Sequence, residues 1–318
     1  MRFAIIGAGA VGGYFGARLI RAGHDVTFLA RGSHLAAIRE RGLEVRSPSG
    51  DFTVRARAEA DPAQVGPVDV VMLAVKTYDN ATALPTVRAL LSSAERSASG
   101  EPRSVVLPLQ NGVDSPGELA ALVGQQAVLG GSAYISTAVT GPGVITQTGE
   151  HQRITLGEFF GDTFRLSPRV EAIRDALASA GINVQAVPDA RVSLWDKLIF
   201  LAPFAGLLGC ARLPLGRLWS LPASRETYLA AAAEVAAVAR AEGVAIETRL
   251  EQLERTVDKL SPDIRASLLV DLEQGKPIEV EALLGSIVRR GRAANVPTPV
   301  TATFYGVLKP HEHGHRQG

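Results

Sequence analysis

The chain has 318 residues, of which 46% are hydrophobic, so it can bury one large core or two ordinary ones, and two domains are the better expectation. Its formal net charge of +1 comes from interspersed acidic and basic residues, which favours neither nucleic acid nor an anionic membrane surface as a partner. The single cysteine, Cys210, excludes an internal disulfide and is typical of a reducing compartment. No apolar run approaches the roughly 20 residues of a membrane span, and glycines interrupt the apolar run at the N-terminus. We therefore expect a cytoplasmic protein that binds a small molecule.

The N-terminal segment follows the order strand, glycine-rich turn, helix, strand. Residues 2 to 6 form a short β-rich run, residues 13 to 21 are amphipathic, and residues 25 to 30 form a second β-rich run. Gly23, just before that second run, fits the C-cap of a helix. The turn between the first strand and the helix has the pattern GxGxxG and consists of Gly7, Ala8, Gly9, Ala10, Val11 and Gly12. This order predicts a βαβ unit.

Strands and helices continue to alternate up to about residue 188, which predicts a sheet that is parallel at its start. Short alternating runs between residues 127 and 160, joined by Gly-Pro and polar turns, favour an antiparallel extension. The other elements expected in this part are a strand at 69 to 74, a helix at 80 to 91, a polar loop at 92 to 103, a strand at 104 to 109, a helix at 168 to 180 and a strand at 181 to 187.

The chain after residue 188 is predicted to be helical. The expected helices span roughly 190 to 209, 222 to 242, 247 to 259, 263 to 274 and 280 to 294. The predicted fold class is therefore α/β, with an N-terminal Rossmann-type domain (1–188) that has an antiparallel extension, followed by an all-helical C-terminal domain (189–318). The alanine-rich stretch 230 to 243 is typical of a close helix contact, either in the core or in a homodimer formed through the helical domain.

The glycine turn predicts a dinucleotide site. Its glycines permit a tight turn, a close approach of the backbone to a pyrophosphate, and close packing of helix on strand, while the helix N-terminus attracts the phosphates. The position between a strand and a helix makes this interpretation stronger than that of a simple glycine-rich turn. An NAD enzyme usually has an acidic residue at the end of its second strand, but here the strand ends in Leu29-Ala30-Arg31-Gly32-Ser33. Arg31 can pair with a 2′-phosphate, so we expect NADP (NADPH); the alternative is a solvated surface arginine.

Two further polar residues follow predicted strands, where ligands bind in open α/β sheets. Lys76 follows the strand at 69 to 74, and could bring charge near the adenosine phosphates. Asn111 follows the strand at 104 to 109, and could form a hydrogen bond near the nicotinamide. Asn-Gly alone, however, is usually just a turn.

Lys197 lies in the most apolar stretch of the chain, SLWDKLIFLAPFAGLLG, residues 193 to 209. Desolvation disfavours the charged ammonium, so a lysine in this position needs a partner or a task. It could extend out of the helix to solvent, pair with a carboxylate in the core, or donate a proton in catalysis.

With these residues in view, the chain resembles the ketopantoate reductase (2-dehydropantoate 2-reductase) family over nearly its whole length. The resemblance rests on the glycine turn, Arg31, Lys76, QNG at 110 to 112, KL at 197 and 198, and SLLVDLEQGKPIEVEALLG at 267 to 285. It implies reduction of a small 2-oxo acid by NADPH. It also implies that Lys197 is the general acid, that Glu279 binds the cofactor ribose and helps to set the site, and that Ser267 contacts the substrate. Asn111 would contact the cofactor at the reacting end and lie near the substrate.

The sequence departs from the family where the substrate is expected to bind. The family usually has asparagines one and two helical turns after the catalytic lysine, whereas this chain has Leu201 and Ala205, which share a helix face with Lys197. A bulkier or more apolar 2-oxo acid than ketopantoate would fit these residues better. A dehydrogenase acting on an opine, a β-hydroxyacid or an imine, and a noncatalytic NADP(H)-binding regulator, stay open as alternatives.

The C-terminal histidines carry no metal prediction. His311, His313 and His315 are spaced two residues apart, but they lie in a glycine-containing tail of a kind that is more often mobile than ordered. We therefore expect no metal site.

Overall fold

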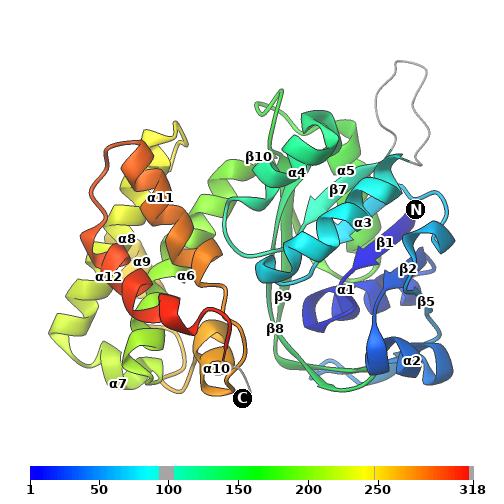
Figure 1. The fold of residues 1–318 in the computed structure, drawn as a ribbon, viewed down its shortest axis with the longest axis horizontal. Coiled ribbons are helices and arrows are strands. Elements are labelled where there is room, and N and C mark those ends of the chain that lie inside the picture. The colour runs from blue at the N-terminus through cyan, green and yellow to red at the C-terminus, as the bar shows by residue number, and fades with distance from the viewer. Residues whose placement is uncertain (93–103, 247, 315–318) are drawn as a thin grey trace. The chain divides into compact units, whose positions relative to one another are not determined.

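The structure is a computed structural model that describes residues 1–92, 104–246 and 248–314. The predicted polar loop at 92 to 103 lies outside this part of the chain except for its first residue, and so does residue 247 of a predicted helix. The chain divides into two compact units: Met1–Gln110 with Ser115–Ala190, and Asn111–Asp114 with Arg191–Gly318. The first unit is α/β and the described part of the second is helical (Figure 1), which confirms the predicted fold class.

The first unit contains a five-stranded parallel sheet with the order β5-β2-β1-β6-β7. Its strands are β1 (Arg2–Ile6), β2 (Asp25–Leu29), β5 (Arg57–Glu59), β6 (Val70–Leu73) and β7 (Val105–Pro108). All of these except β5 agree with predicted strands to within one or two residues. Because β2 lies on one side of β1 and β6 on the other, the strand order reverses between β1 and β6, and ligands of open α/β sheets bind at such a point.

Helices cover both faces of this sheet. On one face, α1 buries Tyr14, Phe15 and Leu19 in the same core cluster as Phe28 of β2. A second cluster, on the other face, includes Val87 of α3. The helices and helical turns of the unit are α1 (Ala10–Arg21), α2 (Gly32–Arg41), η1 (Pro62–Gln64), η2 (Thr77–Asp79), α3 (Asn80–Ser92), α4 (Ser115–Val123), η3 (Gln125–Ala127) and α5 (Pro168–Ser179).

A second sheet in this unit contains the predicted antiparallel pair. Its strands are β3 (Leu43–Arg46), β4 (Phe52–Val54), β8 (Leu129–Gly141), β9 (Val144–Glu158) and β10 (Asn183–Asp189). β8 and β9 pair in an antiparallel manner, as expected, whereas β9 also pairs in parallel with β3 and β10. The pairing of β9 with β3 joins residues as distant as Glu44 and Val144. The pattern of the sequence did not predict this separate mixed sheet, because such a pairing leaves no local signal.

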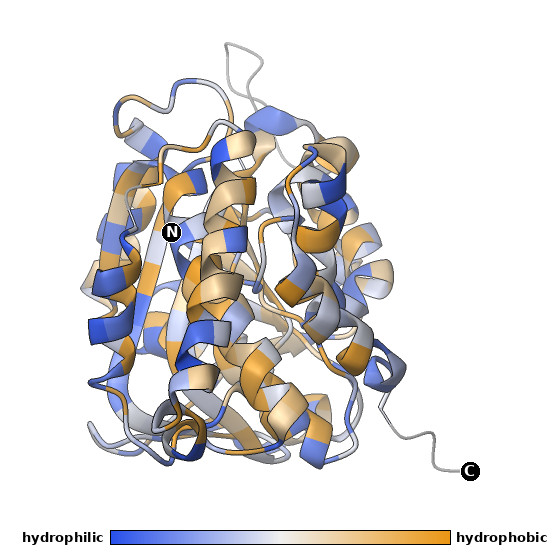
Figure 2. Ribbon diagram, turned by 90° about the vertical axis from the view of Figure 1, so that its left-hand side faces the viewer, coloured by the Kyte–Doolittle hydropathy of each residue, from blue (hydrophilic) through white to orange (hydrophobic). Residues whose placement is uncertain are grey.

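The regular secondary structure in the described part of the second unit is helical, and its ribbons carry both hydrophilic and hydrophobic residues (Figure 2). They are α6 (Ala190–Ala211), α7 (Leu215–Trp219), α8 (Pro222–Ala241), α9 (Leu250–Val257), α10 (Ser267–Glu273), the π-helical turn η4 (Glu281–Gly285), α11 (Ser286–Ala293), α12 (Pro299–Leu308) and η5 (Lys309–His311). α7 and α12 were not predicted, and the helix expected at 280 to 294 is divided into η4 and α11. The alanine-rich stretch contributes Ala231, Ala232 and Val235 of α8 to the buried core of the single chain.

α6 corrects one expectation from the sequence. With 22 residues, it is the one helix in the described ranges that is long and apolar enough to cross a membrane by length and composition. The helix therefore reaches the length of a membrane span, although Asp196 and Lys197 interrupt its apolar residues. However, 67% of its most apolar window is buried inside the protein, as in the core helix of a globular domain.

Candidate functional site

A crevice of about 470 Å³ opens at the carboxyl ends of β1 and β6, where the strand order of the first sheet reverses. This volume is within the range of small-molecule sites, roughly 300 to 1,000 Å³. The predicted cofactor residues Gly7, Ala8, Gly9 and Arg31 all line it. Its other lining residues are Ile6, Leu29, Ala30, His34, Ala60, Val75, Asp79, Thr82, Ala83, Thr86 and Val139.

The three glycines of the turn have different surroundings. Gly7 has φ +98°, and a Cβ there would lie 2.9 Å from the backbone nitrogen of Val75. A Cβ at Gly12 would lie only 2.2 Å from the carbonyl oxygen of Gly7, because α1 packs closely against the turn. A Cβ at Gly9 would meet nothing within 4 Å. Gly7 and Gly12 are thus required by the fold, whereas Gly9 borders open space in the crevice.

The N-terminus of α1 lies at this open position. Gly9 is its N-cap and makes no side-chain capping hydrogen bond, and the first turn, which begins with Ala10 and Val11, has no acidic residue. The first N–H groups of a helix lack partners within the helix and attract anions. The turn and the crevice therefore fit a dinucleotide phosphate.

Arg31 and His34 lie next to this turn. Arg31 is exposed and is the N-cap residue of α2. His34, in the first turn of α2, contacts the Ala8 carbonyl oxygen through Nε2 at 2.8 Å and accepts a hydrogen bond from the Gly143 N–H at Nδ1, 3.0 Å away. A ring nitrogen that accepts a hydrogen bond carries no proton, so His34 donates from Nε2 to Ala8. His34 thereby fixes the glycine turn. The sequence interpretation did not include His34 among the site residues, although its position in the first helical turn after Arg31 could have indicated it.

The turns after β6 and β7 are joined by hydrogen bonds. Lys76 is the N-cap residue of η2, and its neighbour Val75 lines the crevice. The Gln110 amide donates to the Val75 carbonyl oxygen at 2.9 Å and to Asn80 Oδ1 at 2.7 Å, and accepts from the Ser115 hydroxyl at 2.8 Å. The end of β7 is therefore fixed immediately before Asn111.

The second unit brings together Lys197, Asn111 and Glu279, which are far apart in the sequence. Lys197 Nζ donates to Asn111 Oδ1 at 3.0 Å, and Asn111 Nδ2 donates to Glu279 Oε2 at 3.2 Å. Lysine can only donate and a carboxylate can only accept, so this pair of contacts determines the orientation of the Asn111 amide. Glu279 is 5% exposed, and a buried carboxylate is costly unless it is hydrogen-bonded. The arrangement joins an amine donor, an amide and a buried carboxylate in one chain of hydrogen bonds.

The segment after Glu279 is anchored by a cluster of charged and polar side chains. Glu281, in η4, accepts hydrogen bonds from Tyr305, Lys309 and Arg289. Partial burial alone would raise the pKa of Glu281, but the hydrogen bonds from Lys309, Tyr305 and Arg289 outweigh it and lower the pKa to about 2. A short π-helical turn is uncommon and is often found at functional sites. Here it follows Glu279 almost directly.

The other predicted substrate residues lie on α6 and α10. Leu201 is half-buried and Ala205 is buried, one and two turns after Lys197 on α6. Ser267 is exposed and opens α10. Leu201 and Ala205 give the helix an apolar surface after the lysine.

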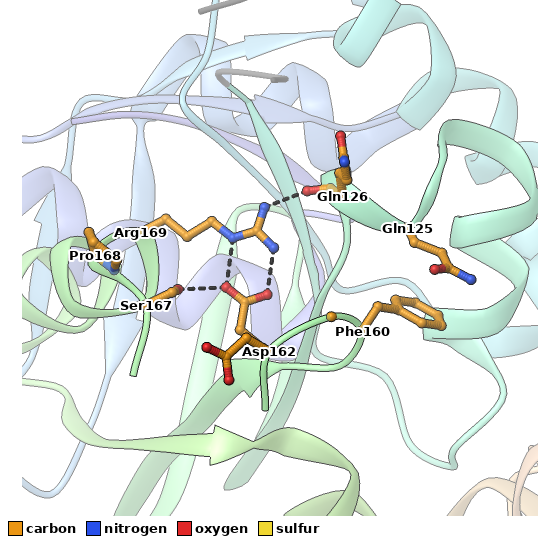
Figure 3. A pocket seen from close by; sticks show the side chains of 9 residues that line it. Gln125, Gln126, Phe160, Asp162, Ser167, Pro168 and Arg169 are labelled. Atoms are coloured by element: carbon orange, nitrogen blue, oxygen red, sulfur yellow. Dashed lines mark hydrogen bonds and ion pairs between the residues drawn. The ribbon is translucent and has the colours of Figure 1, made fainter. Parts of the chain in front are cut away.

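A second cavity, of about 560 Å³, lies in the first unit around the start of α5 (Figure 3). Arg169 Nε donates to the Glu158 carboxylate at 2.7 Å, and the Ser167 hydroxyl also donates to Glu158. Arg169 makes a further bond to the Gln126 carbonyl oxygen. These bonds neutralise a carboxylate whose side chain is 6% exposed, and they tie α5 to the end of β9. The bonds between Arg169 and Glu158 in this cavity therefore stabilise the fold.

Within residues 1–92, 104–246 and 248–314, no group of three or more His, Cys, Asp or Glu side chains could hold a metal ion. His311 and His313 belong to these ranges, and His315 lies outside them.

Comparison with known proteins identifies the family. The model for ketopantoate reductase PanE/ApbA matches residues 3–161, and the model for its C-terminal domain matches residues 189–312. A 2-dehydropantoate 2-reductase from Nostoc sp. is 31% identical over 100% of this chain and 97% of its own length. An uncharacterized oxidoreductase, YkpB of Bacillus subtilis, is 29% identical over 98% of this chain and 99% of its own length.

Solved structures agree with this result. The crystal structure of 2-dehydropantoate 2-reductase from Geobacter metallireducens is 30% identical, has a TM-score of 0.87 and covers 98% of this chain and 99% of its own. D-mandelate dehydrogenase with NADH and anilino(oxo)acetate has a TM-score of 0.84 over 98% of both chains, but at 20% identity it shows the fold alone. The matched family is named for a reductase, and the Nostoc and Geobacter proteins are 2-dehydropantoate 2-reductases, which are oxidoreductases that act on CH–OH and C=O groups. The chain belongs to the ketopantoate reductase family.

Proposed function

We propose that the protein reduces a 2-oxo acid to the 2-hydroxy acid with NADPH, and that Lys197 is the general acid. The observation that carries this proposal is the chain of hydrogen bonds from Lys197 through Asn111 to Glu279. Residues 1–188 would bind the cofactor, and residues 189–318 would supply the catalytic and substrate groups.

The residues of this chain have separate tasks in the proposed reaction. A bound reduced nicotinamide supplies the hydride to the carbonyl carbon of the substrate. Lys197 Nζ holds the proton that the carbonyl oxygen requires, and its positive charge stabilises the negative charge that develops on this oxygen. Asn111 orients the ammonium, and Glu279 holds the Asn111 amide in place. Ser267 contacts the substrate.

The glycine turn would hold the cofactor, with Gly7 to Gly12 and the first N–H groups of α1 at the pyrophosphate. The preference for NADPH rests on Arg31, which lines the crevice, and on the lack of an acidic residue at the end of β2. Lys76 would add positive charge near the phosphates. Replacing Arg31→Ala should weaken NADPH binding at least about tenfold, since a charge-assisted bidentate pair is lost, and leave NADH binding unchanged. Equal weakening of both cofactors would reject this role of Arg31.

The substrate is a 2-oxo acid with an apolar side chain in this proposal. Leu201 and Ala205 on α6 support it, because they offer no polar group to the hydroxyl of ketopantoate. Each lost hydrogen bond costs about 0.5 to 1.5 kcal/mol net, so two lower affinity by about one to two orders of magnitude. The replacement Leu201→Asn should therefore raise turnover of ketopantoate relative to a branched apolar 2-oxo acid. Unchanged relative turnover would count against the role of Leu201.

The reaction is tested by mixing the protein with NADPH and either 2-oxo acid while following loss of absorbance at the nicotinamide band. Lys197→Ala should abolish this loss while NADPH still binds. Lys259→Ala removes an exposed lysine of the second unit and serves as the matched control, with turnover like that of wild type. Tight NADPH binding without oxidation by any 2-oxo acid would reject the proposed reaction and favour a noncatalytic binding role.

A further inference from the structure

The loop that carries Asn111 is held within the second unit at successive residues. Asn111–Asp114 groups with this unit, although its neighbours in the chain on both sides group with the first. Gly112 has φ +92°, and a Cβ there would lie 2.8 Å from the Ala282 carbonyl oxygen. Val113 is 3% exposed. The loop thus packs tightly, and its last residue, Asp114, is the one with a charge.

Asp114 is bound by an arginine that is itself fixed. Arg290 of α11 donates to Asp114 Oδ1 from Nε at 3.0 Å and from Nη2 at 2.6 Å. Its third nitrogen, Nη1, donates to the two carboxylate oxygens of Glu242 at 2.6 and 2.7 Å. The side chains of Asp114, Arg290 and Glu242 are 27%, 30% and 28% exposed. A partly buried arginine bound on both sides keeps its planar fork in one orientation, which gives it geometric specificity.

A second arginine of α11 connects the same carboxylate to the segment after Glu279. Arg289 Nη2 lies 3.4 Å from Asp114 Oδ2, and Arg289 Nη1 pairs with Glu281 in η4. α11 therefore anchors both the Asn111 loop and the turn that follows Glu279. Movement of this anchor would change the distance between the amide and the carboxylate.

We propose that Asp114 is a positioning residue, which through its bond to Arg290 holds the Asn111 amide between Lys197 and Glu279. The inference rests on the proposed function, in which Lys197 donates the proton. Asp114 acts through Asn111 and does not contact the reacting atoms. A misplacement of a catalytic group by about 1 Å can cost about 10²-fold in rate, so a salt bridge at the base of this loop affects catalysis.

The test is a double-mutant cycle on kcat with wild type, Asp114→Ala, Asn111→Ala and the double variant. Asp114→Ala should lower kcat at least about tenfold and leave the KM for NADPH unchanged. In the Asn111→Ala background the same replacement should have no further effect, because the two residues act as one unit. Asp114→Asn keeps one acceptor oxygen for Arg290 and should recover part of the loss.

Glu273→Ala is the matched control. Glu273 pairs with Arg265 in the same unit and is 31% exposed, much like Asp114, so its removal should change kcat by less than about twofold. Asp114→Ala should stay folded, because Arg290 keeps its bonds to Glu242 and no buried charge is left alone. The thermal unfolding curve checks this.

An equal loss of kcat in the wild-type and Asn111→Ala backgrounds would overturn the proposal. A crystal structure of Asp114→Ala decides it independently of activity: Asn111 Oδ1 should have left hydrogen-bond distance of Lys197 Nζ, and an intact contact would overturn the positioning role. If wild type reduces no 2-oxo acid, the proposed function fails, whereas the crystal structure still gives a separate answer for Asp114.

Discussion

Replacement of two glycines by alanine separates what the turn does for the fold from what it does for the cofactor. The variants are Gly9→Ala and Gly12→Ala, which add the same methyl group three residues apart. At Gly12 the methyl carbon would lie 2.2 Å from the Gly7 carbonyl oxygen and 2.9 Å from Ile5 Cγ2. Because the nearer atom belongs to the backbone, α1 or the turn must shift by about 1 Å. Such overpacking costs about 1 to 3 kcal/mol.

At Gly9 the same methyl group would meet nothing within 4 Å, and φ is −70°, which alanine adopts without strain. Alanine lowers the entropy of the unfolded chain, which stabilises the folded protein by about 0.4 to 1 kcal/mol. Alanine is also a poorer N-cap than glycine, which destabilises the helix, so the two effects nearly cancel. The fold is therefore indifferent to Gly9→Ala. The methyl group instead occupies the space through which a pyrophosphate would approach the backbone.

The two measurements are thermal unfolding without ligand and fluorescence titration with NADPH. Gly12→Ala should lower Tm by several degrees, since about 1 kcal/mol corresponds to about 2 to 4 °C for a domain of this size. Gly9→Ala should leave Tm within about 2 °C of wild type and weaken NADPH binding at least tenfold, or about 1.4 kcal/mol. Wild-type affinity in Gly9→Ala would refute the close approach of a pyrophosphate to this turn. A wild-type Tm in Gly12→Ala would refute the steric argument.

Three further predictions concern stability and reactivity. Arg169→Ala should destabilise the protein by about 3 to 5 kcal/mol in urea unfolding, because it leaves the buried Glu158 carboxylate without its main partner; a loss below 1 kcal/mol would contradict this. The lowered pKa of Glu281, about 2, means that its cluster stabilises the protein above pH 4.5 and that this contribution is lost as the pH falls from 4.5 towards 2. The side chain of Glu281 is 34% exposed, so after solvent screening the contribution is about 1 to 2 kcal/mol, and Glu281→Gln should lower stability at pH 7 but not at pH 2. Burial raises the pKa of Cys210 to about 11. Alkylation of Cys210 by iodoacetamide at pH 8 should therefore be at least about tenfold slower in the native than in the unfolded protein, because the thiolate is the reactive form. Equal rates in the two states would contradict this prediction.

Local features of the chain were encoded strongly enough to predict. The run from Arg2 to Gly23 determines its own structure, because buried β-branched residues, a turn that requires glycine at position 7 and an amphipathic helix each favour one conformation. The helices after residue 188 follow from apolar periodicity in the same way. The short α7 and the division of the helix at 280 to 294 were not predictable, because one or two turns carry too little periodic signal.

Only the tertiary structure decided which residues that are distant in the sequence pair with one another. The second sheet needs β3 beside β9, and the candidate proton-transfer group needs Asn111 beside Lys197 and Glu279. Motifs and family resemblance in the sequence indicated the three site residues as candidates. No short stretch of the sequence, however, indicates how close together these distant residues lie in the fold. The bond between Arg290 and Asp114 was not visible at all, since an acidic residue shortly after Asn-Gly looks in the sequence like a typical turn residue. Local conformation depends on the preferences of neighbouring residues, whereas contacts across the chain depend on the packing free energy of the whole fold, which no short stretch of sequence contains.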